Sequence, residues 1–410
     1  MNIRPYNPQN DRESAHRIWQ EVGWVSSDTD LQAMDIFLDG CQSYVTTIND
    51  EAECLVAATP GTIQYLDERL PLTAIMAVTT SRIARKQRLA SRLTAHAIAQ
   101  QAAEGAYVAA LGIFDQGFYN QLGFGNGRYV ITAYFDPANL TIPTHHRIPQ
   151  RFTADDWQAI HTARLNRTLG HAACNITSPN QLHAEILWSP KSFGLGYTDD
   201  AGNITHHFWA APADDVENGP YHIWWLDYQT PTQLRELLSL VKSLGDQVRL
   251  VRLEEPRGVQ IQDFLNQPFR NIALTNKSKY ENRLRAIAYW QMRICDLAGC
   301  LTHTHLPGPD LRFNLSLTDP ITQFLPDDTP WHGVHGDFTI TLGPTSAATP
   351  GHTPNLPLMT ATINAFTRLW LGIRPPSGLA ISDTLNAPPS LLTALDQKLR
   401  LPTPITGWDF

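Results

Sequence analysis

Residues 75–124 read IMAVTTSRIARKQRLASRLTAHAIAQQAAEGAYVAALGIFDQGFYNQLGF, and the order of elements in this stretch decides the fold. The apolar run Ile75–Val78 predicts a strand, which stops at a polar turn. Leu89, Leu93 and Ala97 then mark the apolar face of a helix that ends near Gly105. The rest of the stretch predicts a second strand over 107–111 and a short helical turn over 118–124, which is closed by a glycine.

Basic side chains crowd the start of the predicted helix: Arg82, Arg85, Lys86, Arg88 and Arg92. The N-terminus of a helix is already positive because its first backbone N–H groups have no partner within the helix. Cations are disfavoured there, so we interpret them as the binding site of an external anion such as a pyrophosphate. The alternative interpretation is a solvated helix face.

The basic loop and the Phe-Tyr-x-x-Leu-Gly-Phe turn resemble the core of the GCN5-related N-acetyltransferases (GNAT). In that family a loop of pattern Arg/Gln-x-x-Gly-x-Gly/Ala holds the pyrophosphate of acetyl-CoA. Residues 85–90 keep the first and last positions, but Arg88 stands at the central glycine, where its side chain either obstructs the phosphate or contacts it. The resemblance implies that acetyl-CoA is the co-substrate and that it is bound by Val78, Thr79, Thr80, Arg85, Lys86, Gln87, Arg88, Leu89 and Ala90.

Length and composition limit the remaining possibilities. The chain has 410 residues, enough for about three domains of ordinary size, and its 42% of hydrophobic residues can fill their cores. Its five cysteines are few and scattered, which favours reduced thiols over a disulfide framework. The N-terminus has no apolar signal region, no long apolar segment is present, and the net charge is −8. We therefore expect a cytoplasmic protein that binds neither membrane nor nucleic acid.

Strand and helix patterns suggest three consecutive domains of an α/β (α+β) protein. We place the first at 1–150, a second GNAT-like domain without a cofactor loop at 151–289, and a third at 290–410. The second contains the predicted elements 222–228, 231–244 and 248–253, in the order strand, helix, strand. The third contains two alternating strands and two helices, in an order that resembles the sterol-carrier-protein-like module.

Two GNAT-like units followed by such a module resemble the enhanced intracellular survival (Eis) acetyltransferases. The C-terminal run PTPITGWDF over 402–410 is similar to the tail of that family. The resemblance implies that Tyr119 is the general acid, that the terminal carboxylate of Phe410 is the general base, and that the protein is a homohexamer. Each residue also has an alternative interpretation without a catalytic role: Tyr119 as a core aromatic, and Phe410 as a frayed end of the chain.

Three residues are candidates for binding the acceptor. Trp24 and Asp28 lie where acetyltransferases of this architecture place substrate-binding helices, although an acidic helix start also explains Asp28. Asp409 is a cation partner beside the proposed base. The pairs His303/His305 and His332/His335 lack the cysteine or acidic cluster that would complete a metal site, so no metal is expected.

These observations predict an N-acetyltransferase that moves the acetyl group of acetyl-CoA to a primary amine. Family resemblance suggests aminoglycosides, polyamines or lysine side chains as acceptors. The alternative hypothesis is a non-catalytic ligand-binding or scaffold protein in which Arg88 has cost the first domain its acetyl-CoA.

Overall fold

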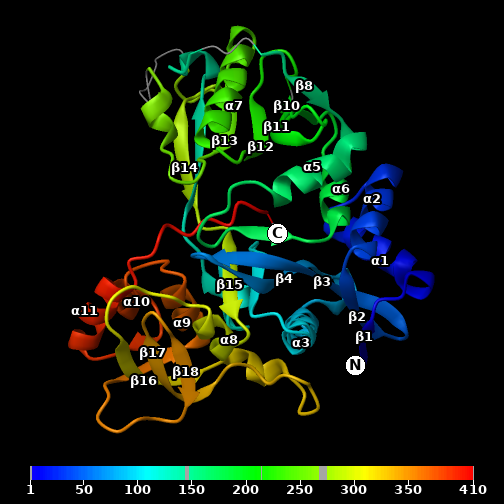
Figure 1. The fold of residues 1–410 in the computed structure, drawn as a ribbon. Coiled ribbons are helices and arrows are strands. Elements are labelled where there is room, and N and C mark those ends of the chain that lie inside the picture. Colours follow the sequence, from blue (N-terminus) through cyan, green and yellow to red (C-terminus); the bar gives the residue numbers. More distant parts are fainter. Residues whose placement is uncertain (1, 144–146, 214, 267–274, 410) are drawn as a thin grey trace. The chain divides into compact units, whose positions relative to one another are not determined.

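The computed structural model describes residues 2–143, 147–213, 215–266 and 275–409. They form two compact units (Figure 1). The first unit comprises residues 1–128, 170–178 and 288–410, and the second comprises 129–169 and 179–287. Each unit combines helices with mixed sheets, which confirms the predicted α/β class.

The first unit contains a mixed sheet on which the candidate site is built. Among its described strands β4 and β5 pair in parallel, and the other neighbours are antiparallel. In spatial order the strands are β1 (Asn2–Pro5), β2 (Gln42–Ile48), β3 (Glu51–Tyr65), β4 (Glu68–Thr80), β5 (Val108–Gly112), β15 (Trp290–Ile294) and β6 (Gly125–Asn126), with β9 (Cys174–Ile176) beside β3.

Helices from the N-terminal part of the chain pack against this sheet. Helix α1 (Pro8–Val22) is capped by Asn7, and α2 (Asp28–Asp39) begins with a capping box in which Ser27 and Asp30 exchange hydrogen bonds. Helix α3 (Leu89–Ala103) follows the short 3-10 helix η1 (Arg82–Ala84) and buries Leu89, Leu93 and Ala97 in the core. The helix predicted from those three positions is therefore confirmed.

The same unit carries a second, smaller sheet with its own helices. Its strands, in spatial order, are β18 (Ala347–Pro350), β17 (Gly336–Leu342), β16 (Leu311–Thr318), β19 (Leu358–Thr362) and β20 (Leu385–Asn386). The helices are α8 (Leu297–Thr302), η6 (Pro320–Phe324), α9 (Ile363–Trp370), α10 (Pro376–Ser382) and α11 (Pro389–Lys398). Ile321 and Phe324 of η6 share a hydrophobic cluster with α3, so the C-terminal part packs directly on the first sheet.

The second unit is a single mixed sheet with helices α5 (Trp157–Leu165), α6 (Pro179–Trp188) and α7 (Pro231–Ser243). Its strands, in spatial order, are β14 (Arg283–Ile287), β7 (Val130–Phe135), β13 (Val251–Glu254), β12 (Tyr221–Asp227), β11 (Ile204–Pro212), β10 (Phe193–Thr198) and β8 (Gln150–Phe152). Strand β12, helix α7 and strand β13 form a parallel crossover, as the alternation of strand and helix predicts. The short 3-10 helices are η2 (Pro137–Asn139), η3 (Ala154–Asp156), η4 (Leu244–Asp246) and η5 (Ile261–Phe264).

The expected domain boundaries at 150 and 289 separate two strands from the sheets to which they belong. Strand β7, expected in the first domain, pairs with β13 and β14 of the second unit. Strand β15, expected to open the third domain, lies between β5 and β6 of the first sheet. The pattern of a strand shows which face is buried, but strand pairing is made by backbone groups that every residue carries. The sequence therefore does not reveal the partner.

Two features are absent from the described residues. No helix in this part of the chain is long and apolar enough to cross a membrane. No group of three or more histidine, cysteine or acidic side chains within it is placed to hold a metal ion.

Candidate active site

The site lies where the two parallel strands of the first sheet separate. Residues 72–74 of β4 pair with residues 108–110 of β5, and both strands continue beyond the last pair, Ala74 and Ala110. On its other side β5 stays paired, since the Ile113 amide donates to the Tyr289 carbonyl at 2.7 Å. Beyond Ala74 and Ala110 the two strands are no longer paired, so the first sheet has an opening between β4 and β5.

Strand β4 is bulged at this opening. Met76 pairs with Ala57 and Thr79 with Leu55, so that Ala77 and Val78 together face the single residue between them on β3. Ala77 has a φ of 55°, in the left-handed region that non-glycine residues rarely occupy. A bulge takes one residue out of the hydrogen-bond ladder. The bulge therefore places the irregular backbone of the Ala77–Val78 pair at the opening of the sheet.

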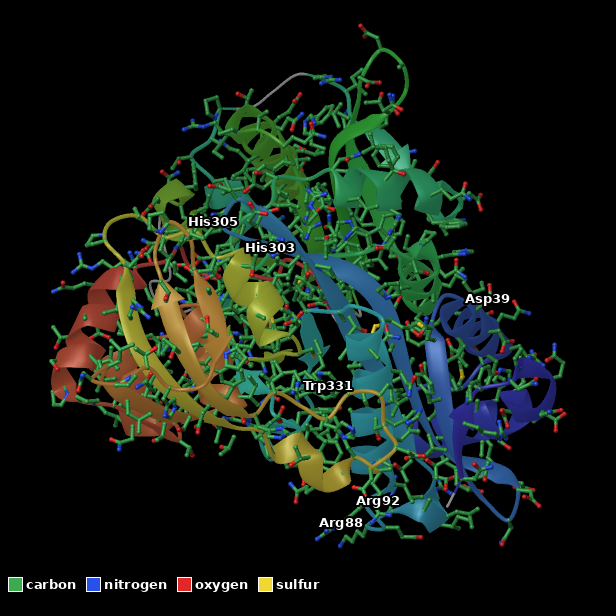
Figure 2. All side chains as sticks on the ribbon, turned by 60° about the horizontal axis from the view of Figure 1, so that its bottom comes forward. Asp39, Arg88, Arg92, His303, His305 and Trp331 are labelled. Carbon is green, nitrogen blue, oxygen red and sulfur yellow. The ribbon has the colours of Figure 1, made fainter. Side chains whose placement is uncertain are left out.

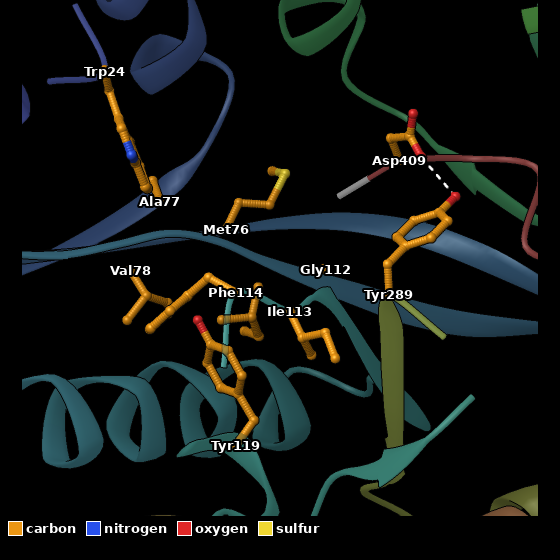
Figure 3. A pocket seen from close by; sticks show the side chains of 11 residues that line it. Trp24, Met76, Ala77, Val78, Gly112, Ile113, Phe114, Tyr119, Tyr289 and Asp409 are labelled. Atoms are coloured by element: carbon orange, nitrogen blue, oxygen red, sulfur yellow. Dashed lines mark hydrogen bonds between the residues drawn. The ribbon is translucent and has the colours of Figure 1, made fainter. Parts of the chain in front are cut away.

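A pocket of about 340 Å³ occupies the opening (Figure 3). Segments that lie far apart in the sequence contribute to it: the turn after α1, the bulge of β4, the end of β5, the residue before β15 and the C-terminal tail. The lining residues are Trp24, Ile75, Met76, Ala77, Val78, Gly112, Ile113, Phe114, Tyr119, Tyr289 and Asp409.

Tyr119 lies on a short helical turn at the edge of the pocket. The turn, α4 (Gln116–Asn120), is capped by Asp115, whose carboxylate accepts from the Gly117 amide at 2.8 Å. Tyr119 is 3% exposed, and its hydroxyl points toward the β4 segment in Figure 3. Burial raises the pKa of Tyr119 above its ordinary value. The side chain is therefore a neutral phenol at physiological pH.

Side chains of helix α9 and strand β15 form hydrogen bonds with this turn. The Asn364 side-chain amide, on α9, donates to the Asn120 carbonyl and to the Phe124 carbonyl, each at 2.8 Å. The buried Gln291 amide, on β15, donates to the Gln116 carbonyl at 3.3 Å and also to Asn126. These bonds connect the turn to α9 and β15. The C-terminal part of the first unit thus fixes the position of the turn.

A buried ion pair adds to this support. Arg293 and Asp319 are both fully buried, and their closest nitrogen–oxygen distance is 2.6 Å. Arg293 also donates to the Leu122 carbonyl at 2.5 Å, and its guanidinium lies 4.9 Å from the centre of the Trp331 ring. Gly123 has a φ of 84°, and a Cβ there would come within 2.6 Å of Arg293. The turn therefore requires glycine at position 123 for its conformation and for the approach of Arg293.

The C-terminal tail docks beside the pocket. The Thr406 carbonyl accepts from the Cys174 amide at 2.8 Å, and Trp408 is buried. Asp409 then lines the pocket, where its Oδ1 accepts from the Tyr289 hydroxyl at 2.7 Å (Figure 3). Phe410, expected as the general base, lies outside the described residues.

The loop before α3 exposes its basic side chains. Arg85, Lys86 and Arg88 are exposed, and none of the three has a carboxylate partner among the described residues. Arg88 lies just before the first residue of α3, no side chain caps the helix, and Figure 2 shows Arg88 and Arg92 projecting from the same end. The φ of Arg88 is 60°, a left-handed conformation that glycine adopts without strain. Arg88 therefore holds a backbone conformation that favours glycine, although the residue is arginine.

The structure brings together some of the predicted site residues and separates others. Trp24, Val78, Tyr119 and Asp409 line one pocket, whereas Asp28 occupies the exposed first turn of α2 and does not line it. The remaining predicted residues belong to the strand end 79–80, which still pairs with β3, and to the loop and helix start 85–90, where Leu89 is buried.

Sequence reasoning missed the aromatic residues Phe114 and Tyr289. Tyr289 directly precedes β15, and Phe114 lies two residues after the end of β5. Nothing in the local pattern distinguishes them from ordinary loop aromatics.

Comparison with a known family assigns the sheet that carries this pocket. Residues 2–127 match the model of the acetyltransferase (GNAT) domain family. That range contains the basic loop, the bulge of β4 and the Tyr119 turn. No curated protein matches the chain.

Solved structures share the fold over the whole chain. A protein from Enterococcus faecalis described as a probable N-acyltransferase aligns with a TM-score of 0.81 and 18% identity, covering 100% of this chain and 99% of its own. A GCN5-related N-acetyltransferase from Anabaena variabilis has a TM-score of 0.79 at 14% identity, and Eis1 from Mycobacterium abscessus has 0.77 at 14%. Both cover 100% of each chain. The structural likeness shows the fold, and the family model shows that residues 2–127 are similar to the acetyltransferase (GNAT) domain.

Proposed function

We propose that the protein transfers the acetyl group of acetyl-CoA to a primary amine in this pocket, with Tyr119 as general acid. The observation that carries the proposal is the convergence of the bulged β4 segment, the Tyr119 side chain and Asp409 on one pocket. GNAT domains use acetyl-CoA. The exposed side chains of Arg85, Lys86 and Arg88 suit the phosphates of acetyl-CoA. The pocket suits the thioester end of the same molecule.

The reaction needs a hydrogen-bond donor for the carbonyl oxygen, an acid and a base from the chain. The amine nitrogen attacks the thioester carbonyl carbon, and a backbone amide of the bulge stabilises the oxygen as it becomes negative. The C–S bond then breaks, and Tyr119 gives its proton to the leaving thiolate. The thiolate forms in the same buried surroundings that raise the pKa of Tyr119. These surroundings raise the proton affinity of the thiolate as well.

A base must take the proton that the attacking amine loses. We propose the terminal carboxylate of Phe410 for this role, acting through water, because the tail is anchored up to Asp409 at the pocket. A carboxylate with an ordinary pKa of about 3.5 is a weak base toward an ammonium, so a water relay suits it better than direct transfer. By resemblance to the Eis family we also propose a homohexamer and a sterol-carrier-protein-like C-terminal module.

Calorimetric titration of acetyl-CoA into the protein with its native C-terminus tests the proposal, followed by thiol release with a panel of amines. Binding with amine-dependent release supports the acetyltransferase. Absence of binding at millimolar acetyl-CoA would contradict the proposal. It would favour the alternative hypothesis of a non-catalytic ligand-binding or scaffold protein.

Replacing Arg88 with glycine should weaken acetyl-CoA binding by roughly tenfold, the effect of losing one charge-assisted hydrogen bond to phosphate. The exposed side chain favours this outcome over obstruction. The same change should stabilise the fold by about 1 kcal/mol, because glycine adopts a φ near 60° without strain. Calorimetric titration measures the first effect and thermal unfolding the second.

Lys191 offers a matched control, since it is also an exposed cation with a left-handed φ, of 64°. Lys191→Gly should raise stability similarly and leave acetyl-CoA binding unchanged. Tighter binding by Arg88→Gly would mean that the arginine obstructs the cofactor.

Extending the chain beyond Phe410 should lower turnover by roughly a hundredfold or more, because the carboxylate becomes an amide and loses its basicity. A short Gly-Ser extension tests this in comparison with the same extension at the N-terminus. Full activity of the C-terminally extended protein would remove Phe410 as the base.

A further inference from the structure

Residues 82–88, the basic loop before α3, contain strained backbone. Lys86 and Arg88 have φ values of 61° and 60°, in the left-handed region that residues with a side chain rarely adopt. Both residues are exposed, so burial of their side chains does not hold this conformation. Strain of this kind persists where the surrounding structure fixes the segment. The shape of the loop therefore depends on how its two ends are anchored.

Both ends of the loop are anchored to other elements of the first unit. At the C-terminal end, Leu89 of α3 is buried in the core. At the N-terminal end, the amide of buried Ser81 donates to the Glu53 carbonyl of β3 at 2.9 Å. The next amide, that of Arg82, donates to the Glu21 carboxylate at 2.6 Å. Glu21 belongs to α1, so a side chain that precedes the loop by 61 residues fixes the first amide of the loop.

An ion-pair network holds the Glu21 side chain in place. Arg17, one turn earlier on α1, donates to Glu21 at 3.2 Å and to Glu53 at 2.9 Å, and the Glu53 side chain is 3% exposed. The hydrogen bond from the Arg82 amide, with a smaller contribution from Arg17, lowers the pKa of the Glu21 carboxyl. Glu21 is therefore ionised at physiological pH, and it connects the loop to α1 and to the first sheet.

A carboxylate at this place is unfavourable for an anion site if only its charge is considered. The charge of Glu21 repels a phosphate bound by the loop, although Arg17 offsets part of this effect. The contact of Glu21 with the backbone explains its position better than its charge does. A carboxylate that accepts from a backbone N–H group forms a stronger hydrogen bond than a neutral oxygen, and so holds the chain more firmly.

We propose that Glu21 is a positioning residue of the acetyl-CoA site, which fixes the start of the basic loop so that Arg85, Lys86 and Arg88 are placed before the pyrophosphate arrives. Ordering a loop during binding costs conformational entropy, and a loop that is ordered in advance avoids this cost. Glu21 acts through the loop. This inference rests on the proposed acetyl transfer and adds to it a residue that lies outside the loop.

Two acetyl donors that share the thioester but differ in the pyrophosphate test the inference: acetyl-CoA and S-acetyl-pantetheine. Glu21→Ala removes the anchor and should raise the dissociation constant of acetyl-CoA by roughly tenfold, measured by calorimetric titration. The kcat/KM for S-acetyl-pantetheine, measured by thiol release with the same amine, should stay within about threefold of the native value, because this donor has no phosphate for the loop to hold.

Two further variants separate the backbone contact from the charge. Glu21→Gln removes the charge but keeps an oxygen that can accept from the Arg82 amide, so it should bind acetyl-CoA within about threefold of the native protein. Glu13→Ala is the matched control, since Glu13 is an exposed carboxylate about two turns earlier on the same helix. It should leave acetyl-CoA binding unchanged.

The sign of the effect decides between an anchor and a mere charge. If Glu21 acted only by its charge, Glu21→Ala and Glu21→Gln would both bind acetyl-CoA more tightly. Unchanged or tighter binding by Glu21→Ala would therefore overturn the inference. An equal loss with S-acetyl-pantetheine would also overturn it, because it would show a general structural effect. Absence of acetyl-CoA binding by the native protein would instead contradict the proposed function itself.

Discussion

Phenylalanine in place of Tyr119 should lower kcat by roughly ten- to ten-thousand-fold, the range expected when a positioned general acid is lost. The change removes one hydroxyl from a ring that is otherwise buried among Phe114, Phe118 and Phe124. Packing is kept, so the dissociation constant of acetyl-CoA should stay nearly the same. Steady-state kinetics with a good amine acceptor, together with calorimetric titration, separates the two quantities.

Tyr44 provides the control for this substitution. It is another buried tyrosine of the same hydrophobic cluster, on β2, and it does not line the pocket. Tyr44→Phe should leave kcat within about threefold, which is the spread of small packing effects. Equal turnover by Tyr119→Phe and the native protein would remove Tyr119 as the acid and reduce it to a core aromatic.

Arg293→Met should destabilise the first unit by about 3–5 kcal/mol, because it leaves the buried Asp319 carboxylate without a counter-charge. Asp319 cannot move to water, since its oxygens also accept from the amides of Ile321 at 3.2 Å and Val334 at 2.8 Å. The loss of the Leu122 contact should loosen the Tyr119 turn as well. Calorimetry measures the stability, and hydrogen exchange at residues 119–124 measures the turn.

A double variant separates the buried charge from the rest of the effect. Arg293→Met with Asp319→Asn removes both charges and keeps an acceptor oxygen for one of the two amides, so it should be more stable than Arg293→Met alone. Arg293→Lys keeps the charge but loses the forked geometry and should lie between the native protein and Arg293→Met. A double variant no more stable than the single one would show that lost packing, rather than the unpaired charge, is the cost.

Local pattern was enough for several elements of the site. The apolar spacing of Leu89, Leu93 and Ala97 predicted α3, and the glycine of the Phe118–Phe124 turn predicted a tight closure. Both depend on residues close in sequence, where periodicity and backbone preference act directly. The left-handed φ of Arg88 was not predicted, because this conformation is uncommon for a residue with a side chain.

The sequence by itself determined the α/β class, the helix with its basic start and the tyrosine turn, because these arise from short-range periodicity and charge. Tertiary structure alone decided that β15 completes the first sheet and that β7 leaves it, since backbone pairing carries no mark of its partner. It also decided that Trp24, Phe114, Tyr289 and Asp409 meet at one pocket. The pocket forms where β4 and β5 stop pairing, and the residues that surround such an opening come from whichever segments the fold brings there.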